Sequence, residues 1–250
     1  ELSGLVVFLR PLGLRLINGV TSTTGLTGMD AVLLQDYLES GKSLSGDLMI
    51  DAVSKAVATN EVNAAMGKIC ATPTAGSAGV APGVLFALKK RLNPSKEDMI
   101  HFLFTTGAFG FIVANNASIS GAAGGCQAEV GSAAAMSAAA TVEMAGGTPQ
   151  QSAEAFAISL KNMLGLVCDP VAGLVEVPCV KRNAAGASNA IISADMALAG
   201  VTSRIPTDEV IEAMYKIGQT MPSALRETGR GGLAGTPTGE RLKQEIFGNS

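Results

Sequence analysis

Three of the four cysteines lie in the second half of the chain, each beside a glycine or proline that interrupts regular structure. Cys126 follows a Gly-Gly pair, Cys168 opens a Cys-Asp-Pro sequence, and Cys179 follows a proline. The chain has one histidine and no Cys-x-x-Cys pair, so it has few other ways to hold a reactive metal. Three thiolates could bind a metal centre and leave one position open for a substrate. The alternative is that they are small buried hydrophobic side chains, the usual role of a free cysteine.

Length and composition favour one large helical domain. The 250 residues are enough for a substantial core. Only 16% of residues are charged and 47% are hydrophobic, so we expect much of the surface to be buried, internally or against a partner. The apolar side chains are mostly small or aliphatic, and there is no tryptophan, which favours closely packed helices. The net charge of −3 provides no electrostatic basis for binding nucleic acid or an anionic membrane.

Nothing in the sequence predicts export or membrane insertion. Four cysteines in a chain of this length do not resemble a secreted disulfide scaffold, so we expect a cytoplasmic location. No apolar run reaches the roughly 18–20 residues that span a bilayer. The longest, residues 102–114, is interrupted by two threonines and a glycine and is expected to be a core helix. Residues 1–18 are apolar but contain Arg10, Pro11 and Arg15 and lack a small-residue cleavage site, so no signal peptide is predicted.

Capping signals and helical periodicity predict an all-α protein with a single, mainly helical domain. The predicted helices lie at residues 29–38, after a capping box at 95–98, from Thr148-Pro149 towards Leu166, and from Thr207. Only residues 174–177 look briefly strand-like. We assign residues 19–250 to this domain and leave residues 1–18 unassigned.

Four loops between the predicted helices are rich in hydroxyl side chains and glycine. They are residues 21–28, 72–79, 118–125 and 232–239. Glycine lets the backbone approach a ligand, and at a helix N-terminus this composition can bind a carboxylate or phosphate. The plainer interpretation is that such loops only cap helices and make turns. Four of them in one alanine-rich chain favour the convergence of some on a small anionic ligand.

Three longer segments are distinctive: residues 71–79 (ATPTAGSAG), 114–131 (ANNASISGAAGGCQAEVG) and 168–179 (CDPVAGLVEVPC). Together they resemble the bacterial iron–sulfur L-serine dehydratases, most closely the alpha chain of the two-subunit form. The resemblance extends over about residues 19–247 and is specific, because its blocks are long and nearly verbatim. The start of the chain does not fit the family, and Met29 stands where a glycine is expected.

The resemblance implies a 4Fe–4S cluster held by Cys126, Cys168 and Cys179, with one iron free for substrate. The implied activity is that of an L-serine ammonia-lyase, which converts L-serine to pyruvate and ammonium. The open iron would act as a Lewis acid on the departing β-hydroxyl, which a fourth thiolate would block. Cys70 lies outside this set and is expected to be a packed or loop thiol.

The substrate carboxylate would then need hydrogen-bond donors. The first choice is Thr72, Thr74, Gly76, Ser77 and Gly79, and the second is Ser22, Thr24 and Thr27. Residues that lead into Cys126 could line the pocket or bind cluster sulfurs: Asn115, Asn116, Ser118 and Ser120. Three residues after Cys179 could compensate cluster or substrate charge, or could equally form an exposed basic turn: Lys181, Arg182 and Asn183.

No catalytic base is evident among these motifs. His101 is the only histidine, and it lies within a helical stripe, where a surface or packing role is expected. The resemblance implies catalytic histidines on a beta chain. The active enzyme is therefore expected to be a hetero-oligomer of alpha and beta chains.

Two rival interpretations remain open from the sequence. A pyridoxal-phosphate lyase could cradle phosphate with residues 72–79 and form a Schiff base with Lys68 or Lys161, but it would leave the cysteines unexplained. A non-catalytic helical scaffold predicts that Cys126→Ser alters nothing except packing.

Overall fold

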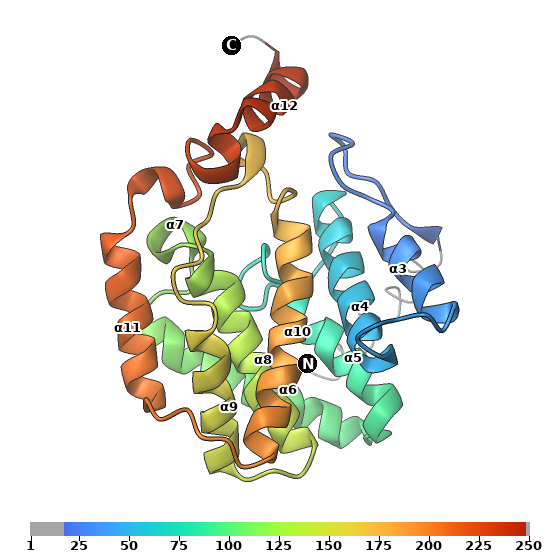
Figure 1. The fold of residues 1–250 in the computed structure, drawn as a ribbon, viewed down its shortest axis with the longest axis vertical. Helices are drawn as coiled ribbons and strands as arrows, with labels where there is room; N and C mark the ends of the chain where they lie inside the picture. Colours follow the sequence, from blue (N-terminus) through green and yellow to red (C-terminus); the bar gives the residue numbers. More distant parts are fainter. Residues whose placement is uncertain (1–17, 249–250) are drawn as a thin grey trace.

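Helices dominate the computed structural model, which describes residues 18–248 (Figure 1). The α-helices are α3 (Asp30–Glu39), α4 (Asp47–Ala64), α5 (Val80–Leu92), α6 (Lys96–Asn116), α7 (Gly121–Gly124), α8 (Ser132–Met144), α9 (Pro149–Lys161), α10 (Cys179–Leu198), α11 (Thr207–Thr220) and α12 (Pro237–Phe247). Shorter turns are the π-helix η1 (Gln127–Gly131) and the 3-10 helices η2 (Val171–Gly173), η3 (Ser223–Leu225) and η4 (Gly232–Gly235). Residues 18–248 otherwise contain two isolated β-bridges and no strand, which confirms the all-α prediction.

Helix α8 forms the centre of the core because its side chains are small. Every residue from Ser132 to Val142 is buried, and six of these eleven are alanines. The small side chains let α5, α6, α9 and α10 pack directly against it. The buried hydroxyl groups of Ser137 and Thr141 donate to carbonyls one turn earlier, each at 2.7 Å. Neither hydroxyl is therefore left without a hydrogen-bond partner in the core.

Helix α10 joins the two sides of the molecule. It packs against α8 and α9 on one side and against α4 and α5 on the other, as Figure 1 shows. Helix α3 packs on α4 at the outer edge. The N-terminal end of α10 and the short α7 point towards the end of the molecule that carries α12 (Figure 1). No helix in residues 18–248 has the length and apolar character needed to cross a membrane.

The predicted helix starts agree with the structure, whereas some other features do not. Capping boxes at Ser95 and Thr148 open α6 and α9. Helix α9 ends at Lys161 and not near Leu166, because the chain turns at once towards Cys168. The strand-like residues 174–177 form an irregular loop, so that prediction was wrong. Of the unassigned segment, residues 1–17 lie outside the described part of the chain.

Helix α6 is not the core helix that its composition predicted. It buries one face through Met99, Phe102, Thr106, Gly110 and Val113. Two phenylalanines on its other face are 58% and 70% exposed, Phe104 and Phe111 respectively. The helix is apolar all round, so periodicity could not distinguish the face that packs from the one that does not.

Candidate functional site

The three predicted cysteine ligands lie together inside the protein. Cys126, Cys168 and Cys179 are all buried, and the thiols of Cys126 and Cys168 are hydrogen-bonded to each other. The Cys179 thiol lies close enough to Cys126 for a charge on one to affect the other. The chain thus brings together three thiols that are 42 and 11 residues apart in sequence.

A different structural device positions each thiol. Cys126 immediately precedes η1, a π-helical turn of the kind that is frequent at functional sites. The backbone of Cys168 pairs with the C-terminal segment, since its N–H donates to Leu225 O at 2.9 Å and its carbonyl accepts from Glu227 N at 2.7 Å. Cys179 is the first residue of α10 and follows the cis Val177–Pro178 peptide bond.

The surroundings keep two of the thiols protonated in the metal-free chain. Burial raises the pKa of Cys179 to about 12. The hydrogen bond with Cys126 raises the pKa of Cys168 far above its usual range, and burial raises it further. The same hydrogen bond lowers the pKa of Cys126. A metal centre that uses all three as thiolates must therefore displace protons as it binds.

This burial predicts how the thiols react in the metal-free chain. Cys70 is exposed, whereas the other three cysteines are buried, and a thiol reagent needs an accessible thiolate. Near neutral pH we expect one thiol per chain to react rapidly with a chromogenic disulfide, and all four after denaturation. Two or more rapidly reacting thiols in the folded chain would contradict the buried arrangement.

A half-buried arginine lies beside the three thiols. The guanidinium of Arg182 donates from Nη1 to Val167 O at 2.8 Å and pairs from Nη2 with Asp169 Oδ1 at 2.8 Å. Burial alone would lower the pKa of Arg182, but Cys126 and Asp169 raise it above its usual value, so the guanidinium remains charged. Asp169 also accepts from the N–H of Leu233. This bond fixes the η4 turn to the loop between Cys168 and Cys179, called here the cysteine loop.

The two neighbours of Arg182 have other roles in the structure. Lys181 is exposed and forms an ion pair with Asp30 at the start of α3. Asn183 is fully buried and fastens the 72–79 loop to α10. Its Oδ1 accepts from Gly79 N at 3.0 Å, and its Nδ2 donates to Gly76 O at 2.7 Å. Of the three candidates for charge compensation, Arg182 is the one that lies beside the thiols.

In the 72–79 loop, Thr74 contacts a residue of η1, and other polar groups hold the loop in place. The Thr74 hydroxyl donates to Glu129, a residue of η1. Ser77 is buried, and its hydroxyl donates to Thr72 O at 3.0 Å. Because the N–H of Gly79 is donated to Asn183, it serves here to hold the loop in place.

The 21–28 loop binds a carboxylate that belongs to the protein. Glu176 is buried in the segment between Cys168 and Cys179, and it accepts from the hydroxyls of Thr24 at 2.9 Å and Thr27 at 3.2 Å. Ser22 lies 3.1 Å from Thr24 and extends this network. These hydroxyls therefore fasten the first loop to the cysteine loop. Just after the loop, Met29 has a φ of +66°, a left-handed conformation that favours the glycine expected there.

Four other predicted residues lie between the end of α6 and the start of α7. Asn115 and Asn116 are exposed at the end of α6, and their amides donate to carbonyls of their own helix at 2.7 and 2.8 Å. The backbone N–H of Ser120 donates to Ser118 Oγ at 3.2 Å. No hydrogen bond joins any of these four to a cysteine in the described residues. His101 is exposed on α6, in agreement with a surface role.

Sequence reasoning missed Glu129. This side chain is 8% exposed, and it lies between Thr74, Gly76 and Gly121 near the Cys168 thiol. Burial raises its pKa, and the nearby carboxylate of Glu227 raises it further. One signal was available, because Glu129 is the only ionisable side chain besides Cys126 in the distinctive segment at residues 114–131.

Comparison with known proteins decides the family. A family model described as "Serine dehydratase alpha chain" matches residues 12–234. The chain belongs to this family. A "Probable L-serine dehydratase, alpha chain" of Bacillus subtilis is 80% identical over 234 residues, which cover 94% of this chain and 78% of that protein. Its counterpart from Latilactobacillus sakei is 67% identical over 202 residues, 81% of this chain and 97% of that protein.

One relative extends well beyond the region that it shares with this chain. "L-serine dehydratase TdcG" of Escherichia coli is 44% identical over 209 residues. The match covers 82% of this chain but only 46% of TdcG. More than half of that relative therefore has no counterpart in the alignment.

The three thiols of this chain are the type of donor that iron–sulfur clusters use. Among residues 18–248, no three His, Cys, Asp or Glu side chains meet closely enough to hold one ion. A 4Fe–4S cluster makes a different demand, because each cysteine thiolate binds a different iron. Three buried thiols beside a charged guanidinium fit that demand. Lys161, a Schiff-base candidate of the rival interpretation, instead donates to Ser203 O at 2.5 Å.

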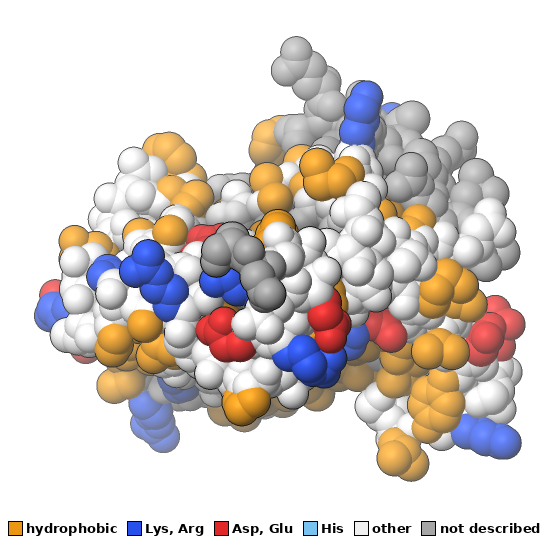
Figure 2. Space-filling view, turned by 90° about the horizontal axis from the view of Figure 1, so that it is seen from above, with side chains coloured by type: hydrophobic (Ala, Val, Ile, Leu, Met, Phe, Trp, Pro, Cys, Tyr) orange, Lys and Arg blue, Asp and Glu red, His pale blue; other side chains and the backbone are white. Residues whose placement is uncertain are grey.

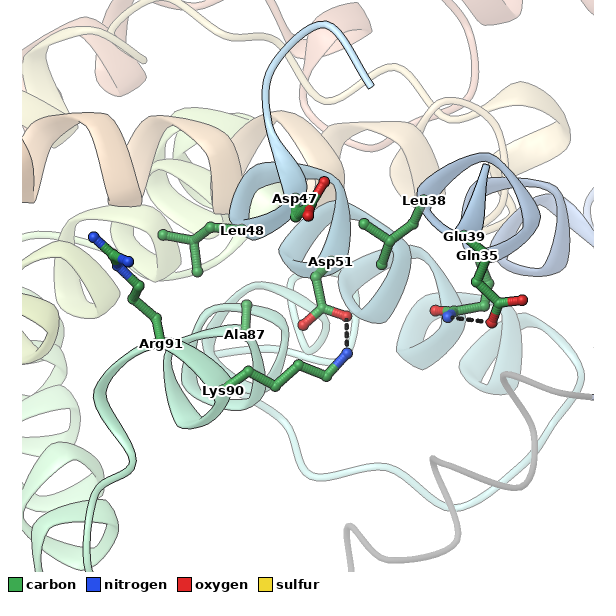
Figure 3. Close-up of a pocket in the computed structure, with 9 residues that line it drawn as sticks. All are labelled: Gln35, Leu38, Glu39, Asp47, Leu48, Asp51, Ala87, Lys90 and Arg91. Atoms are coloured by element: carbon green, nitrogen blue, oxygen red, sulfur yellow. Dashed lines mark hydrogen bonds and ion pairs between the residues drawn. The ribbon is translucent and has the colours of Figure 1, made fainter. Parts of the chain in front are cut away.

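A separate pocket of about 570 Å³ lies between α3, α4 and α5 (Figure 3). Four of its polar side chains form two pairs: Asp51 with Lys90 at 3.0 Å, and Gln35 with Glu39 at 2.9 Å. None of its lining residues is one of the predicted site residues. At the α12 end of the molecule, the surface mixes acidic, basic and apolar side chains (Figure 2). The three thiols are buried and do not form part of the accessible surface.

Proposed function

We propose that this chain is the alpha chain of an L-serine dehydratase, an L-serine ammonia-lyase that forms pyruvate and ammonium. The reaction removes the Cα proton and the β-hydroxyl of serine as water and leaves aminoacrylate. The derived imine then takes up water and releases ammonium. The observation that carries the proposal is the convergence of three buried thiols, in a chain that belongs to the serine dehydratase alpha chain family.

In this proposal Cys126, Cys168 and Cys179 hold a 4Fe–4S cluster, which when bound would supply an iron with an open position as a Lewis acid for the leaving hydroxyl. Arg182 offsets part of the negative charge of three thiolates, because its half-buried guanidinium lies beside them. The buried position of the thiols excludes bulk water, which strengthens electrostatic interactions within the site.

The residues that bind the substrate carboxylate stay predictions. Thr74 is the best placed of the first set, because it contacts Glu129 beside the thiols. The Thr72 hydroxyl donates to Cys70 O at 3.3 Å. Ser77, Gly76, Gly79 and Asn183 would act by holding this loop against α10. Ser22, Thr24 and Thr27 would act through Glu176, which they fasten in the cysteine loop.

The base that removes the Cα proton is expected on a beta chain. The only histidine, His101, is exposed on α6 and has no contact with the thiols. The longer relative TdcG has more than half its length outside the region it shares with this chain, enough for a second functional unit. A hetero-oligomer of alpha and beta chains in the cytoplasm remains the expected working form.

The test is anaerobic reconstitution of the chain with iron and sulfide, alone and with the beta chain. We expect about four irons and four sulfides per alpha chain, the composition of the proposed cluster. L-serine should perturb its visible spectrum, and pyruvate should form only when the beta chain is present. A colourless preparation with full activity would contradict the cluster. Full activity of the alpha chain alone would contradict the assignment of the base to the partner.

A further inference from the structure

Two carboxylates and the Cys168 thiol converge on Gly121. A methyl carbon placed on Gly121 would lie 2.8 Å from Cys168 Sγ, 3.0 Å from Glu129 Oε2 and 3.3 Å from Glu227 Oε2. Only glycine fits at this position, because the Cβ of any other residue would overlap Cys168 Sγ. The two carboxylates come from segments almost 100 residues apart, η1 and the loop after η3.

These two carboxylates lack a cationic partner in the described part of the chain. Glu129 accepts one hydrogen bond, from Thr74 to its Oε1, while its Oε2 accepts none from residues 18–248. The carboxylate of Glu227 likewise has no hydrogen bond or ion pair there. The nearby guanidinium of Arg182 is held by Asp169 and Val167. Two like charges close together in a mostly buried place are costly, and a cation between them would relieve that cost.

The proposed substrate supplies such a cation. L-serine has a β-hydroxyl, a carboxylate and an α-ammonium group, and the first two already have expected partners. The ammonium group has three N–H donors and forms its strongest hydrogen bonds with carboxylates. We propose that Glu129, together with Glu227, binds the α-ammonium group of L-serine and so selects amino acids over hydroxy acids that lack the amino group. This inference rests on the proposed function and assigns the one substrate group left without a partner.

The experiment removes either one carboxylate of the protein or the amino group of the ligand. The anaerobically reconstituted complex with the beta chain is compared as wild type, Glu129→Gln and Glu227→Gln. The ligands are L-serine and 3-hydroxypropionate, which is serine without its amino group. Both affinities are measured from the change that the ligand causes in the visible spectrum and are referred to the iron-loaded fraction. Glu143→Gln is the matched control, because Glu143 also accepts from a threonine hydroxyl, that of Thr105, at the far end of α8.

We expect Glu129→Gln to weaken L-serine binding by about 10- to 100-fold, the usual effect of losing a hydrogen bond between charged groups. Binding of 3-hydroxypropionate should change by no more than about threefold, because that ligand has no group to lose the contact. Glu227→Gln should shift the same ratio in the same direction, and it carries the test if Glu129→Gln does not fold. Glu143→Gln should bind both ligands as the wild type does.

Equal weakening of both ligands would overturn the proposal, because it would indicate a structural effect on the pocket. A loss of kcat with the affinity for serine intact would also overturn it and would assign Glu129 to another step. These results are distinct from failure of the proposed function, which would appear as a reconstituted wild-type complex that does not convert L-serine.

Discussion

Replacement of Cys126 by serine is expected to abolish pyruvate formation and to remove most of the iron from the anaerobically reconstituted protein. Cys126 is buried beside Cys168 and Cys179, so no other thiol can take its place without refolding of η1. A serine hydroxyl holds its proton far more strongly than a thiol and is a poor ligand for iron–sulfur clusters. Loss of partners that only orient metal ligands already costs 10- to 100-fold. Loss of a ligand itself should therefore reduce turnover by more than about 100-fold.

The matched control is Cys70→Ser. Cys70 is exposed, and the contact recorded for its thiol is a weak one with the adjacent Ala71 carbonyl at 3.9 Å. This variant should retain its iron and keep turnover within about twofold of wild type. Thermal unfolding of both metal-free variants separates loss of the cluster from loss of the fold. A Cys126→Ser protein with full iron and full turnover would support the scaffold interpretation, in which these cysteines only fill space.

The sequence predicts helix starts well because capping chemistry is local. Ser95 and Thr148 each satisfy backbone N–H groups within three residues, so the signal is complete in a short segment. Which face of a helix is buried depends on distant partners. In α6, Phe102 is fully buried while Phe104 is mostly exposed, although both are apolar and two residues apart. The sequence contains no local feature that distinguishes the buried phenylalanine from the exposed one.

The same distinction between local and distant contacts applies to the site. Cys126, Cys168 and Cys179 could be singled out because each lies in a distinctive segment. Lys181 and Arg182 could not be ranked, since successive residues of a helix point about 100° apart and only the packing of α10 shows which one reaches the thiols. The contact between Thr74 and Glu129 joins residues 55 apart, so neither residue on its own indicated it.

The hydroxyl-rich loops illustrate a correct chemical idea with a different ligand. The 21–28 loop does bind a carboxylate, as its composition suggested, but in the structure that carboxylate belongs to Glu176. Thr24 and Glu176 are 152 residues apart. Composition indicates which groups a loop can bind, whereas the fold determines which of those groups lies within reach.

Arg182→Leu is expected to lower the free energy of unfolding of the metal-free chain by about 3–5 kcal/mol, the usual effect of removing one partner of a buried ion pair. The side chains of Arg182 and Asp169 are only 16% and 4% exposed, so the substitution leaves a buried carboxylate without its cation. It also removes the hydrogen bond to Val167 O, which fixes the approach to Cys168. The measurement is denaturant unfolding, with iron content after reconstitution as the second readout.

The adjacent Lys181→Leu is the control, because Lys181 is 61% exposed and its ion pair with Asp30 lies at the surface. We expect it to change the free energy of unfolding by less than about 1 kcal/mol. Arg182→Lys keeps the charge but cannot reach both Asp169 Oδ1 and Val167 O with a planar fork, so an intermediate loss is expected. Equal losses for Arg182→Leu and Lys181→Leu would contradict the special position of Arg182. Full iron loading of Arg182→Leu would show that the cluster does not need this positive charge beside its thiolates.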